Sequence, residues 1–345
     1  MSRGPSDLVA ARRRANFARF EPGQRRGHYE SFFVRANHPT RPLAFWIRYT
    51  LVSPVGRPLE ALGELWAIWF DGETGKHVAL KKEVPIHSTR FDREAYRVDV
   101  DEATMSPGRA YGSIGAVSRG IGWDLAYRGG EEPLFLFPIG LYDLPFPKAK
   151  TLVGAPSVIF EGAITVMGES FDVTGWLGSQ NHNWGEKHTD HYAWGQVAGF
   201  DGHPESFLEV ATARLRIGPI WTPFLTPMVL RHEGREISIN AVGEAVQATA
   251  EVPSGPPLDW RFRSVASTPG ELTIEGSIRA EPADFVGLWY ANPPGGRKRC
   301  HNSKIATCDL RLTHPGGRTE VLRAERRAAF EILCEGAIEG VPMRV

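Results

Sequence analysis

Alternating or β-rich segments follow one another along almost the whole chain, and Gly, Pro and Asp residues separate them. Residues 27–35, 43–53 and 63–72 are rich in aromatic and β-branched side chains, and turn-forming pairs such as Asp71-Gly72 end them. A period of two places successive side chains on opposite faces of an extended strand. These segments therefore predict β-strands joined by tight turns.

The same pattern continues to the C-terminus, with hairpins predicted at 111–129 and 157–178 and a new strand series after residue 205. A helical period of 3.6 residues is found only at 6–19 and 323–334. Sequential hairpins without strand–helix–strand alternation favour meandering barrels or sandwiches. The sequence predicts an all-β protein.

The length of 345 residues exceeds what one hydrophobic core usually serves, so we expect two domains. The strand series restarts after the Asp201-Gly202 turn. This places an N-terminal arm at 1–19, a first domain at 20–202 and a second domain at 203–345.

Charge excludes one class of partner. Lys+Arg and Asp+Glu are balanced at 40 each, which leaves no broad electrostatic footprint for nucleic acid. The arm carries three consecutive arginines, Arg12 to Arg14, which can attract a membrane surface weakly, or simply form a solvated arm or short surface helix. The arm lacks the apolar core of a signal peptide, and no apolar run is long enough to span a bilayer. Three cysteines without a Cys-x-x-Cys pair favour a reduced, cytoplasmic setting.

The densest group of chemically active residues lies between 178 and 202. It contains the histidines His182, His188 and His191, the tryptophans Trp184 and Trp194, the acids Glu186 and Asp190, and the amides Asn181, Asn183 and Gln196. The irregular histidine spacing matches no zinc signature, and the chain has no phosphate-binding or dinucleotide fingerprint. We therefore expect neither a metal nor a cofactor.

Acid–base chemistry and ligand recognition are both compatible with this segment. A carboxyl group buried among aromatic rings keeps its proton and can protonate a carbon–carbon double bond, and the rings stabilise the resulting cation. Asp190 and Glu186 are the candidate acids and His191 the candidate proton relay, unless the two acids belong to a solvated loop. Side chains that both donate and accept hydrogen bonds suit the polar end of an apolar ligand, and indoles suit its hydrocarbon body. The predicted ligand contacts in this segment are Asn181, His182, Asn183, Trp184, Trp194 and Gln196.

A second candidate segment, 286–306, gathers Trp289, Tyr290 and Asn302 around a Gly-Pro turn. It either closes the ligand pocket from the other domain or forms an ordinary hairpin with a basic turn.

The stretch Asn181-His182-Asn183-Trp184, followed by Trp194 in "HYAWGQ" and by Asp201-Gly202, resembles the signature of the AttH-like family, which includes the carotenoid 1,2-hydratase hydroxyneurosporene synthase. The resemblance implies two lipocalin-like β-domains with a lipophilic pocket. Members of that family carry Asp-His-Glu-Trp where this chain has Asn181 and Asn183. Asparagine cannot protonate an alkene, so the hydratase chemistry does not transfer directly through these two positions.

Together, the residues and the resemblance predict a cofactor-independent hydratase, cyclase or isomerase. The expected partner is a lipophilic, terpenoid or polyene-like small molecule held in a β-barrel pocket. Two alternatives stay open at this point, a carrier that binds the same class of ligand without turning it over and a metalloenzyme that uses the histidine cluster. No pattern in the sequence bears on the oligomeric state.

Overall fold

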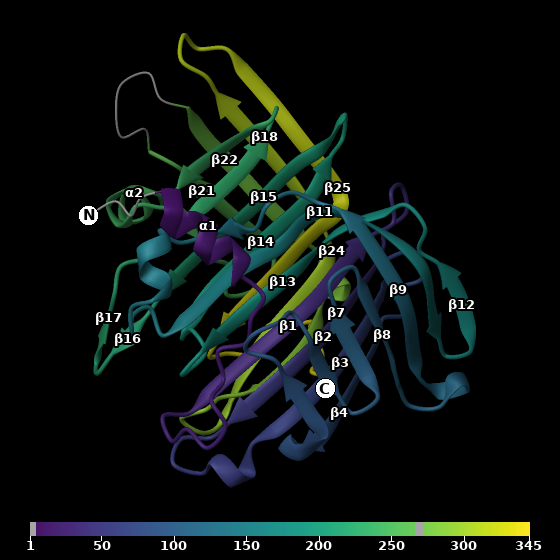
Figure 1. Ribbon diagram of the computed structural model, residues 1–345. Coiled ribbons are helices and arrows are strands. Elements are labelled where there is room, and N and C mark those ends of the chain that lie inside the picture. The colour runs from purple at the N-terminus through teal and green to yellow at the C-terminus, as the bar shows by residue number, and fades with distance from the viewer. Residues whose placement is uncertain (1–4, 266–271) are drawn as a thin grey trace.

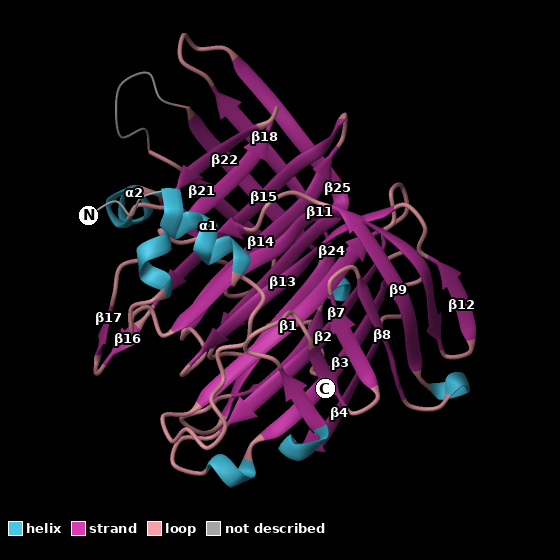
Figure 2. Cartoon of the chain, in the orientation of Figure 1, coloured by secondary structure: helices cyan, strands magenta, loops and turns pink. Residues whose placement is uncertain are grey.

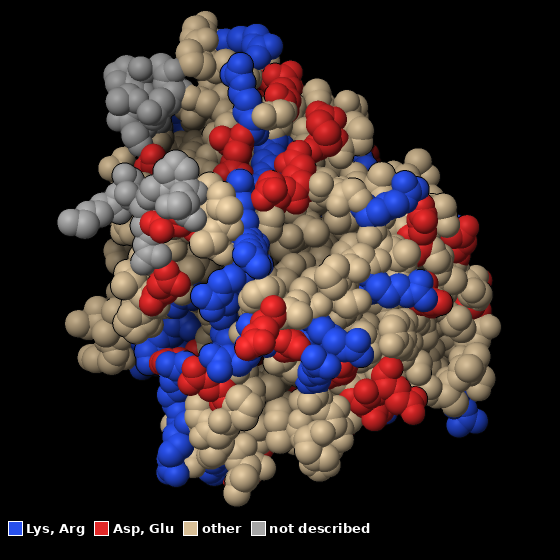
Figure 3. All heavy atoms as spheres, viewed as in Figure 1, with Lys and Arg blue, Asp and Glu red and all other residues tan. Residues whose placement is uncertain are grey.

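The computed structural model describes residues 5–265 and 272–345, so residues 1–4 of the predicted arm lie outside the described part. Two curled antiparallel sheets build the molecule (Figure 1), and helices are few and short (Figure 2). The prediction of an all-β protein is confirmed. Lys and Arg side chains are interspersed with Asp and Glu side chains over the face shown in Figure 3.

The first sheet contains the strands from the N-terminal half of the chain, in the order β4-β3-β2-β1-β13-β11-β9-β8-β7-β6-β5, with β10 and β12 attached to β11. The bounds of these strands are β1 (His28–Asn37), β2 (Leu43–Ser53), β3 (Leu62–Asp71), β4 (Val78–Pro85), β5 (Thr89–Phe91), β6 (Val98–Val100), β7 (Ala103–Ser106), β8 (Arg109–Ile114), β9 (Ile121–Gly129), β10 (Leu134–Phe135), β11 (Ala149–Val166), β12 (Glu169–Asp172) and β13 (Trp176–Gly185).

The second sheet has the order β19-β18-β15-β14-β25-β24-β22-β21-β20, with β23 attached to β24. Its bounds are β14 (His191–Phe200), β15 (His203–Arg214), β18 (Met228–His232), β19 (Arg235–Ile239), β20 (Thr249–Glu251), β21 (Leu258–Arg263), β22 (Thr273–Ala280), β23 (Val286–Ala291), β24 (Arg297–Thr313) and β25 (Thr319–Cys334). A separate two-stranded ribbon pairs β16 (Arg216–Ile217) with β17 (Ile220–Trp221). The helices are α1 (Pro5–Arg13), α2 (Val242–Gln247) and the 3-10 turns η1 (Pro58–Glu60), η2 (Ile86–Ser88), η3 (Val117–Arg119), η4 (Ile139–Tyr142) and η5 (Pro282–Asp284).

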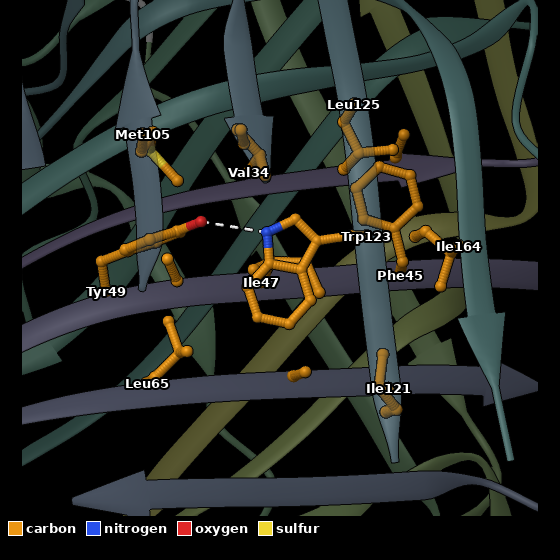
Figure 4. Close-up of a cluster of buried hydrophobic side chains, with 14 of the residues drawn as sticks. Val34, Phe45, Ile47, Tyr49, Leu65, Met105, Ile121, Trp123, Leu125 and Ile164 are labelled. Atoms are coloured by element: carbon orange, nitrogen blue, oxygen red, sulfur yellow. Dashed lines mark hydrogen bonds between the residues drawn. The ribbon is translucent and has the colours of Figure 1, made fainter. Parts of the chain in front are cut away.

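Each sheet curls around a hydrophobic core of its own. In the first sheet, Phe45, Ile47 and Trp123 belong to a cluster of fully or almost fully buried side chains (Figure 4), in which the indole of Trp123 donates a hydrogen bond of 3.0 Å to the hydroxyl of Tyr49. In the second sheet, Trp260 lies in an equivalent cluster. Side chains therefore fill the interiors where a lipocalin-like ligand pocket was expected.

The outer faces of the two sheets pack against each other. A buried cluster joins Phe33, Trp46 and Trp66 of the first sheet to Trp194 and Tyr290 of the second. Every residue of β1 and β2 is buried for this reason, because one face lies in the core of its own sheet and the other against the second sheet.

Two expectations change. Residues 323–334 belong to strand β25 and not to a helix, because residues 328–334 are buried on both faces and lose the alternation of a half-buried strand. The predicted domain division at 202/203 falls in the hairpin between β14 and β15, whereas the chain passes from the first sheet to the second between Gly185 and His191. The division into domains itself stays a prediction.

The N-terminal arm is anchored on the first sheet. Helix α1 leads into residues 14–20, whose backbone amides at Arg19 and Phe20 donate to the carboxylate of Glu30 on β1, at 2.7 Å and 2.9 Å. The arm's attraction to a membrane surface stays a prediction. In the described ranges, no helix combines the length and apolar character needed to cross a bilayer. Cys300, Cys308 and Cys334 are buried, unpaired thiols.

Candidate functional site

A cavity of about 290 Å³ lies where the two sheets face each other. Strands β1, β2, β11 and β13 form one side of it, and β14, β15, β23 and β25 form the other. The loop from Leu136 to Pro147 and helix α2 also contribute to its wall. This volume is at the lower end of the range for small-molecule pockets.

The lining is mostly apolar, with a few polar groups. The apolar and aromatic side chains include Phe33, Trp46, Leu136, Phe137, Leu141, Trp194, Ala211, Ala213 and Leu225. The polar side chains include Tyr29, Arg48, Lys150, Asn183, His188, Tyr192, Tyr290 and Glu331. Such a lining suits an apolar molecule with a polar group at one position.

Arg48 is a buried charged group in the lining with an unsatisfied hydrogen-bond donor. Its side chain is 4% exposed, and its Nε has no hydrogen-bond partner among the residues described. The guanidinium lies over the rings of Tyr290, at 4.5 Å from the centroid, and of Trp46, at 5.6 Å. A buried guanidinium normally has a carboxylate or several acceptors around it, because desolvation of an unpaired charge is costly.

Glu331 is the carboxylate in the lining, and buried donors hold it. Its Oε1 accepts hydrogen bonds from Asn302 at 2.9 Å and from the ammonium of Lys304 at 3.0 Å. Its Oε2 accepts from the hydroxyl of Tyr192, a longer contact of 3.4 Å. Burial raises the pKa of Tyr192 well above its ordinary value, so this hydroxyl keeps its proton at neutral pH.

A second buried pair of opposite charges lies behind the cavity. Glu209 on β15 accepts from the indole of Trp194 and from the amide of Gln196, each at 2.7 Å. Gln196 in turn accepts from the guanidinium of Arg35 at 2.8 Å. Burial raises the pKa of Glu209 to about 7, although these hydrogen bonds and the charge of Arg35 oppose the shift.

The other buried charges around the cavity already have partners. Lys304 is paired with Glu331, and Arg35 is connected through Gln196 to Glu209. Glu64, another carboxylate whose charge acts on Arg48, is already paired with Lys81 at 2.7 Å. Among the described residues around the cavity, no carboxylate forms an ion pair with Arg48, and the ammonium of Lys150 in the same lining donates to the carbonyl of Pro147.

His188 adds a neutral imidazole to the wall. Its ring stacks on Tyr29 with 4.0 Å between centroids, and its Nε2 lies 3.1 Å from the carbonyl of Ala291, to which it donates. Burial, helped by the charge of Arg48, lowers the pKa of His188 to about 3. The remaining nitrogen, Nδ1, is then available as an acceptor.

The structure distributes the predicted ligand contacts over three places. Asn183, Trp194 and Tyr290 line the cavity. Asn181, Gln196 and Asn302 are buried in the polar networks behind the lining, where Asn181 accepts from Gln196 at 2.7 Å and Asn302 contacts Glu331. His182, Trp184 and Trp289 lie elsewhere.

His182 and Trp184 lie on the opposite face of β13 because neighbouring positions in a strand point to opposite sides. His182 Nδ1 lies 2.7 Å from the carbonyl of Ala15 in the arm, and its Nε2 lies 2.8 Å from Glu30. Burial alone would raise the pKa of Glu30, but hydrogen bonds from His182 and His28 lower it to about 2. Trp184 packs on Ala15, and the guanidinium of Arg19 lies over its ring.

The three predicted catalytic residues are near one another but are not among the described residues that line the cavity. Asp190 is paired with Lys187 at 2.7 Å and Lys298 at 3.5 Å. Its burial would raise its pKa, but hydrogen bonds from Lys187 and from the Arg216 amide lower it. Glu186 is paired with Lys148 at 3.1 Å, and Trp289, on β23, is covered by Arg299.

His191 is half-buried beside Trp221, Phe224 and Arg214. Burial and the charge of Arg214 lower its pKa. Because both ring nitrogens of His182 have protein partners and Nε2 of His188 donates to a carbonyl, the histidines of the 178–202 segment do not converge on one ion. The roles predicted for Asp190, Glu186 and His191 stay predictions.

Sequence reasoning did not select Arg48, Glu331, Tyr192 or Lys304. One signal in the sequence could have found the first two. Arg48 interrupts the run LAFWIRYTLV and Glu331 interrupts AAFEILC, and each is a lone charge within an otherwise apolar run. A lone charge in a strand that is buried on both faces needs a partner or a function.

No family model matches the chain. Uncharacterized proteins from two strains of Mycobacterium tuberculosis, CDC 1551 / Oshkosh and ATCC 25618 / H37Rv, are each 22% identical to it over 305 residues, covering 85% of this chain and 82% of the relative.

Solved structures are similar over most of their length. A candidate AttH protein from Nitrosomonas europaea has a TM-score of 0.55 at 14% identity, covering 92% of this chain and 98% of that one. Kievitone hydratase from Nectria haematococca has a TM-score of 0.56 at 11% identity, covering 89% and 88%. CghA, solved with Sch210972, has a TM-score of 0.57 at 12% identity, covering 90% and 89%. The chain therefore has the two-sheet, lipocalin-like fold of these AttH-type structures.

Proposed function

We propose that this protein is a cofactor-independent enzyme that adds water to, or cyclises, an unsaturated and largely apolar small molecule. The molecule binds in the cavity between the sheets, and a carbonyl oxygen conjugated with its double bonds accepts hydrogen bonds from Arg48. The observation that carries the proposal is the buried guanidinium of Arg48 in an apolar cavity, without a carboxylate of its own. The similarity in fold to kievitone hydratase supports the choice of reaction class.

Arg48 supplies the electrophilic half of the chemistry. A guanidinium donates to a carbonyl oxygen through several N–H groups and stays charged at every relevant pH. Inside a cavity with apolar walls, its field acts on the substrate with little screening. It therefore withdraws electrons from the conjugated double bond, which lowers the barrier to attack by water and to ring closure alike.

Glu331 supplies the proton transfers of hydration. As a carboxylate held by Lys304 and Asn302, it takes a proton from a water molecule that attacks the β-carbon of the conjugated system. The electron pair of the double bond moves onto the oxygen bound by Arg48. Glu331 then returns its proton to the α-carbon, which completes the addition of one water molecule.

This route differs from direct protonation of an isolated alkene, which needs a carboxyl group that holds its proton in the cavity. Asp190 has a lowered pKa and lies outside the cavity lining. Glu209 has a raised pKa, but it is not among the described residues that line the cavity. Polarisation by Arg48 requires no such acid.

The test uses a conjugated terpenoid ketone and, as its matched probe, the hydrocarbon that lacks only the carbonyl oxygen. Binding is followed by quenching of Trp46 and Trp194, which line the cavity. We expect Arg48→Met to weaken ketone binding roughly 10- to 100-fold, the loss of a charge-assisted hydrogen bond, and to leave hydrocarbon binding unchanged. Equal effects on both probes would contradict the role of Arg48.

Turnover in ¹⁸O-labelled water separates the remaining possibilities. A hydratase incorporates the label and loses turnover in Glu331→Gln, whereas a cyclase forms an unlabelled isomer and retains turnover in that variant. A protein that binds the ketone tightly but yields neither product from a panel of conjugated ketones is a carrier, and that result would contradict the proposal.

A further inference from the structure

Three hairpin ends of the second sheet bring a separate group of histidines and carboxylates together. His203 is the first residue of β15, His232 is the last residue of β18, and Glu320 lies at the start of β25. Strands β18, β15, β14 and β25 are consecutive neighbours in the second sheet (Figure 1). The three residues are far apart in the sequence and are not among the residues that line the cavity.

Their ligand atoms lie close together. His232 Nε2 lies 3.1 Å from Glu320 Oε1, and His203 Nε2 lies 3.8 Å from the same oxygen. Zinc bonds to imidazole nitrogen and carboxylate oxygen are about 2.0–2.1 Å, so neighbouring ligands in a tetrahedral site are about 3.3 Å apart. Both imidazoles are therefore near the ligand spacing to Glu320, and the half-exposed ring of His203 must turn toward His232 for one ion to reach all three atoms. Glu205 is placed to add a ligand, since its carboxylate, His203 and His232 can offer atoms within 4.8 Å of one another.

Hydrogen bonds at both ring nitrogens fix the orientation of His232. The hydroxyl of Ser206 lies 2.8 Å from Nδ1 and 3.3 Å from Glu205 Oε1, and Nε2 lies 3.1 Å from Glu320 Oε1. The ring has two tautomers in this setting: Nε2–H donates to Glu320 while Nδ1 accepts from Ser206, or Nδ1–H donates to Ser206 while Nε2 presents a lone pair. The second tautomer is the one that binds a metal ion through Nε2.

Other charged groups face the cluster and compete for Glu320. His314 Nε2 lies 3.2 Å from Glu320 Oε2, and the exposed guanidinium of Arg318 lies 3.3 Å from the same histidine nitrogen. Glu233 adds negative charge next to His232. Arg318 opposes a dication, but solvent and salt screen a charge on an exposed turn.

We propose that His203, His232 and Glu320 bind a divalent transition-metal ion of the zinc type, with Glu205 as the additional ligand. Two imidazoles and one carboxylate are a ligand set that zinc accepts, and the half-exposed position of His203 gives an ion access from solvent. The ion ties β15, β18 and β25 together at one end of the second sheet. It takes no part in the chemistry of the cavity, and the expected absence of a metal from the 178–202 segment does not bear on this cluster.

The test titrates zinc chloride into the untagged, chelator-treated full chain by calorimetry at pH 7.5, with cobalt(II) absorption as a second measurement. We expect one equivalent of zinc to bind and to raise the thermal midpoint of unfolding. His203→Asn and Glu320→Gln, both at accessible positions that allow folding, abolish this binding, whereas His87→Asn at a remote exposed histidine leaves it unchanged.

Ser206→Ala is the test of the hydrogen bond to His232, and we expect it to weaken zinc binding roughly 10- to 100-fold. Saturable one-to-one binding that disappears in His203→Asn and Glu320→Gln supports the site. No saturable binding, or equal binding by the wild type and both variants, would overturn it.

Discussion

Replacing Arg48 with methionine is expected to stabilise the ligand-free protein while damaging ligand binding. Methionine has a similar length and no charge, so it removes a buried cation that lacks a carboxylate partner among the described residues. Replacing buried charges with well-packed apolar side chains stabilises by about 1–4 kcal/mol. The variant also loses the cation–π contacts with Tyr290 and Trp46, which reduces this stabilisation by about 0.5–1 kcal/mol for each ring. The two ranges together give a net change between about −1 and +3 kcal/mol, so we expect a gain of about 1 kcal/mol in the free energy of unfolding.

The corresponding change in thermal midpoint is small but measurable. The entropy of unfolding is about 2.1 cal/mol/K per residue, which for 345 residues gives about 0.7 kcal/mol/K. A gain of about 1 kcal/mol therefore raises the midpoint by about 1–2 °C. Differential scanning calorimetry of protein that has been stripped of bound lipids by organic extraction measures this shift.

Arg35→Met is the matched control, because it removes the same group from a position with partners. The guanidinium of Arg35 donates to Gln196 at 2.8 Å and to Asn37 at 2.7 Å, and its charge faces Glu209. Removing one member of a buried charge pair destabilises by about 3–5 kcal/mol. If Arg48→Met destabilised the ligand-free protein as strongly as Arg35→Met, Arg48 would be a structural residue, and the reasoning from its missing partner would be refuted.

Further predictions concern the acids and the indole around the cavity. Glu209 has a folded-state pKa of about 7, above that of an unfolded glutamate, so its protonated form stabilises the fold at low pH and this stabilisation is lost as the pH rises through about 7. Denaturant titrations should show a loss of about 3 kcal/mol in the free energy of unfolding between pH 4.5 and 7.5. The Glu209→Gln variant should show a flatter pH profile. Trp194→Phe removes the indole N–H that donates a hydrogen bond to Glu209, and it should lower the free energy of unfolding in urea by about 1–3 kcal/mol. An unchanged urea midpoint would show that this hydrogen bond contributes nothing to stability. Asp190→Asn and Glu186→Gln should retain turnover of the conjugated ketone, because neither acid is among the described residues that line the cavity. Loss of turnover in Asp190→Asn with ligand binding intact would assign the catalytic role to Asp190 instead.

Local turn chemistry made much of the fold predictable. Asp71-Gly72 and Asp201-Gly202 end strands as expected, and the alternating segments between such turns are strands in the structure. The helical expectation for 323–334 failed because residues 328–334 of strand β25 are buried on both faces, which removes the alternation that identifies a half-buried strand.

The cavity was less accessible to sequence reasoning because it forms where two sheets meet. The motif at 178–202 does approach it, since Asn183 and Trp194 reach the lining, but the strand period sends His182 and Trp184 to the opposite face. The groups with the most distinctive chemistry, Arg48 and Glu331, come from strands that are distant in the sequence. No local sequence pattern indicates how the outer faces of the two sheets pack, so the placement of Arg48 and Glu331 in one cavity could not be predicted.

The most direct test of the central claim is a crystal structure of the protein soaked with the conjugated terpenoid ketone. The account predicts the ligand between the two sheets, its carbonyl oxygen within hydrogen-bond distance of the Arg48 guanidinium and its hydrocarbon body against Trp46 and Trp194. A ligand inside the interior of either sheet, or one in the cavity with its oxygen turned away from Arg48, would contradict it.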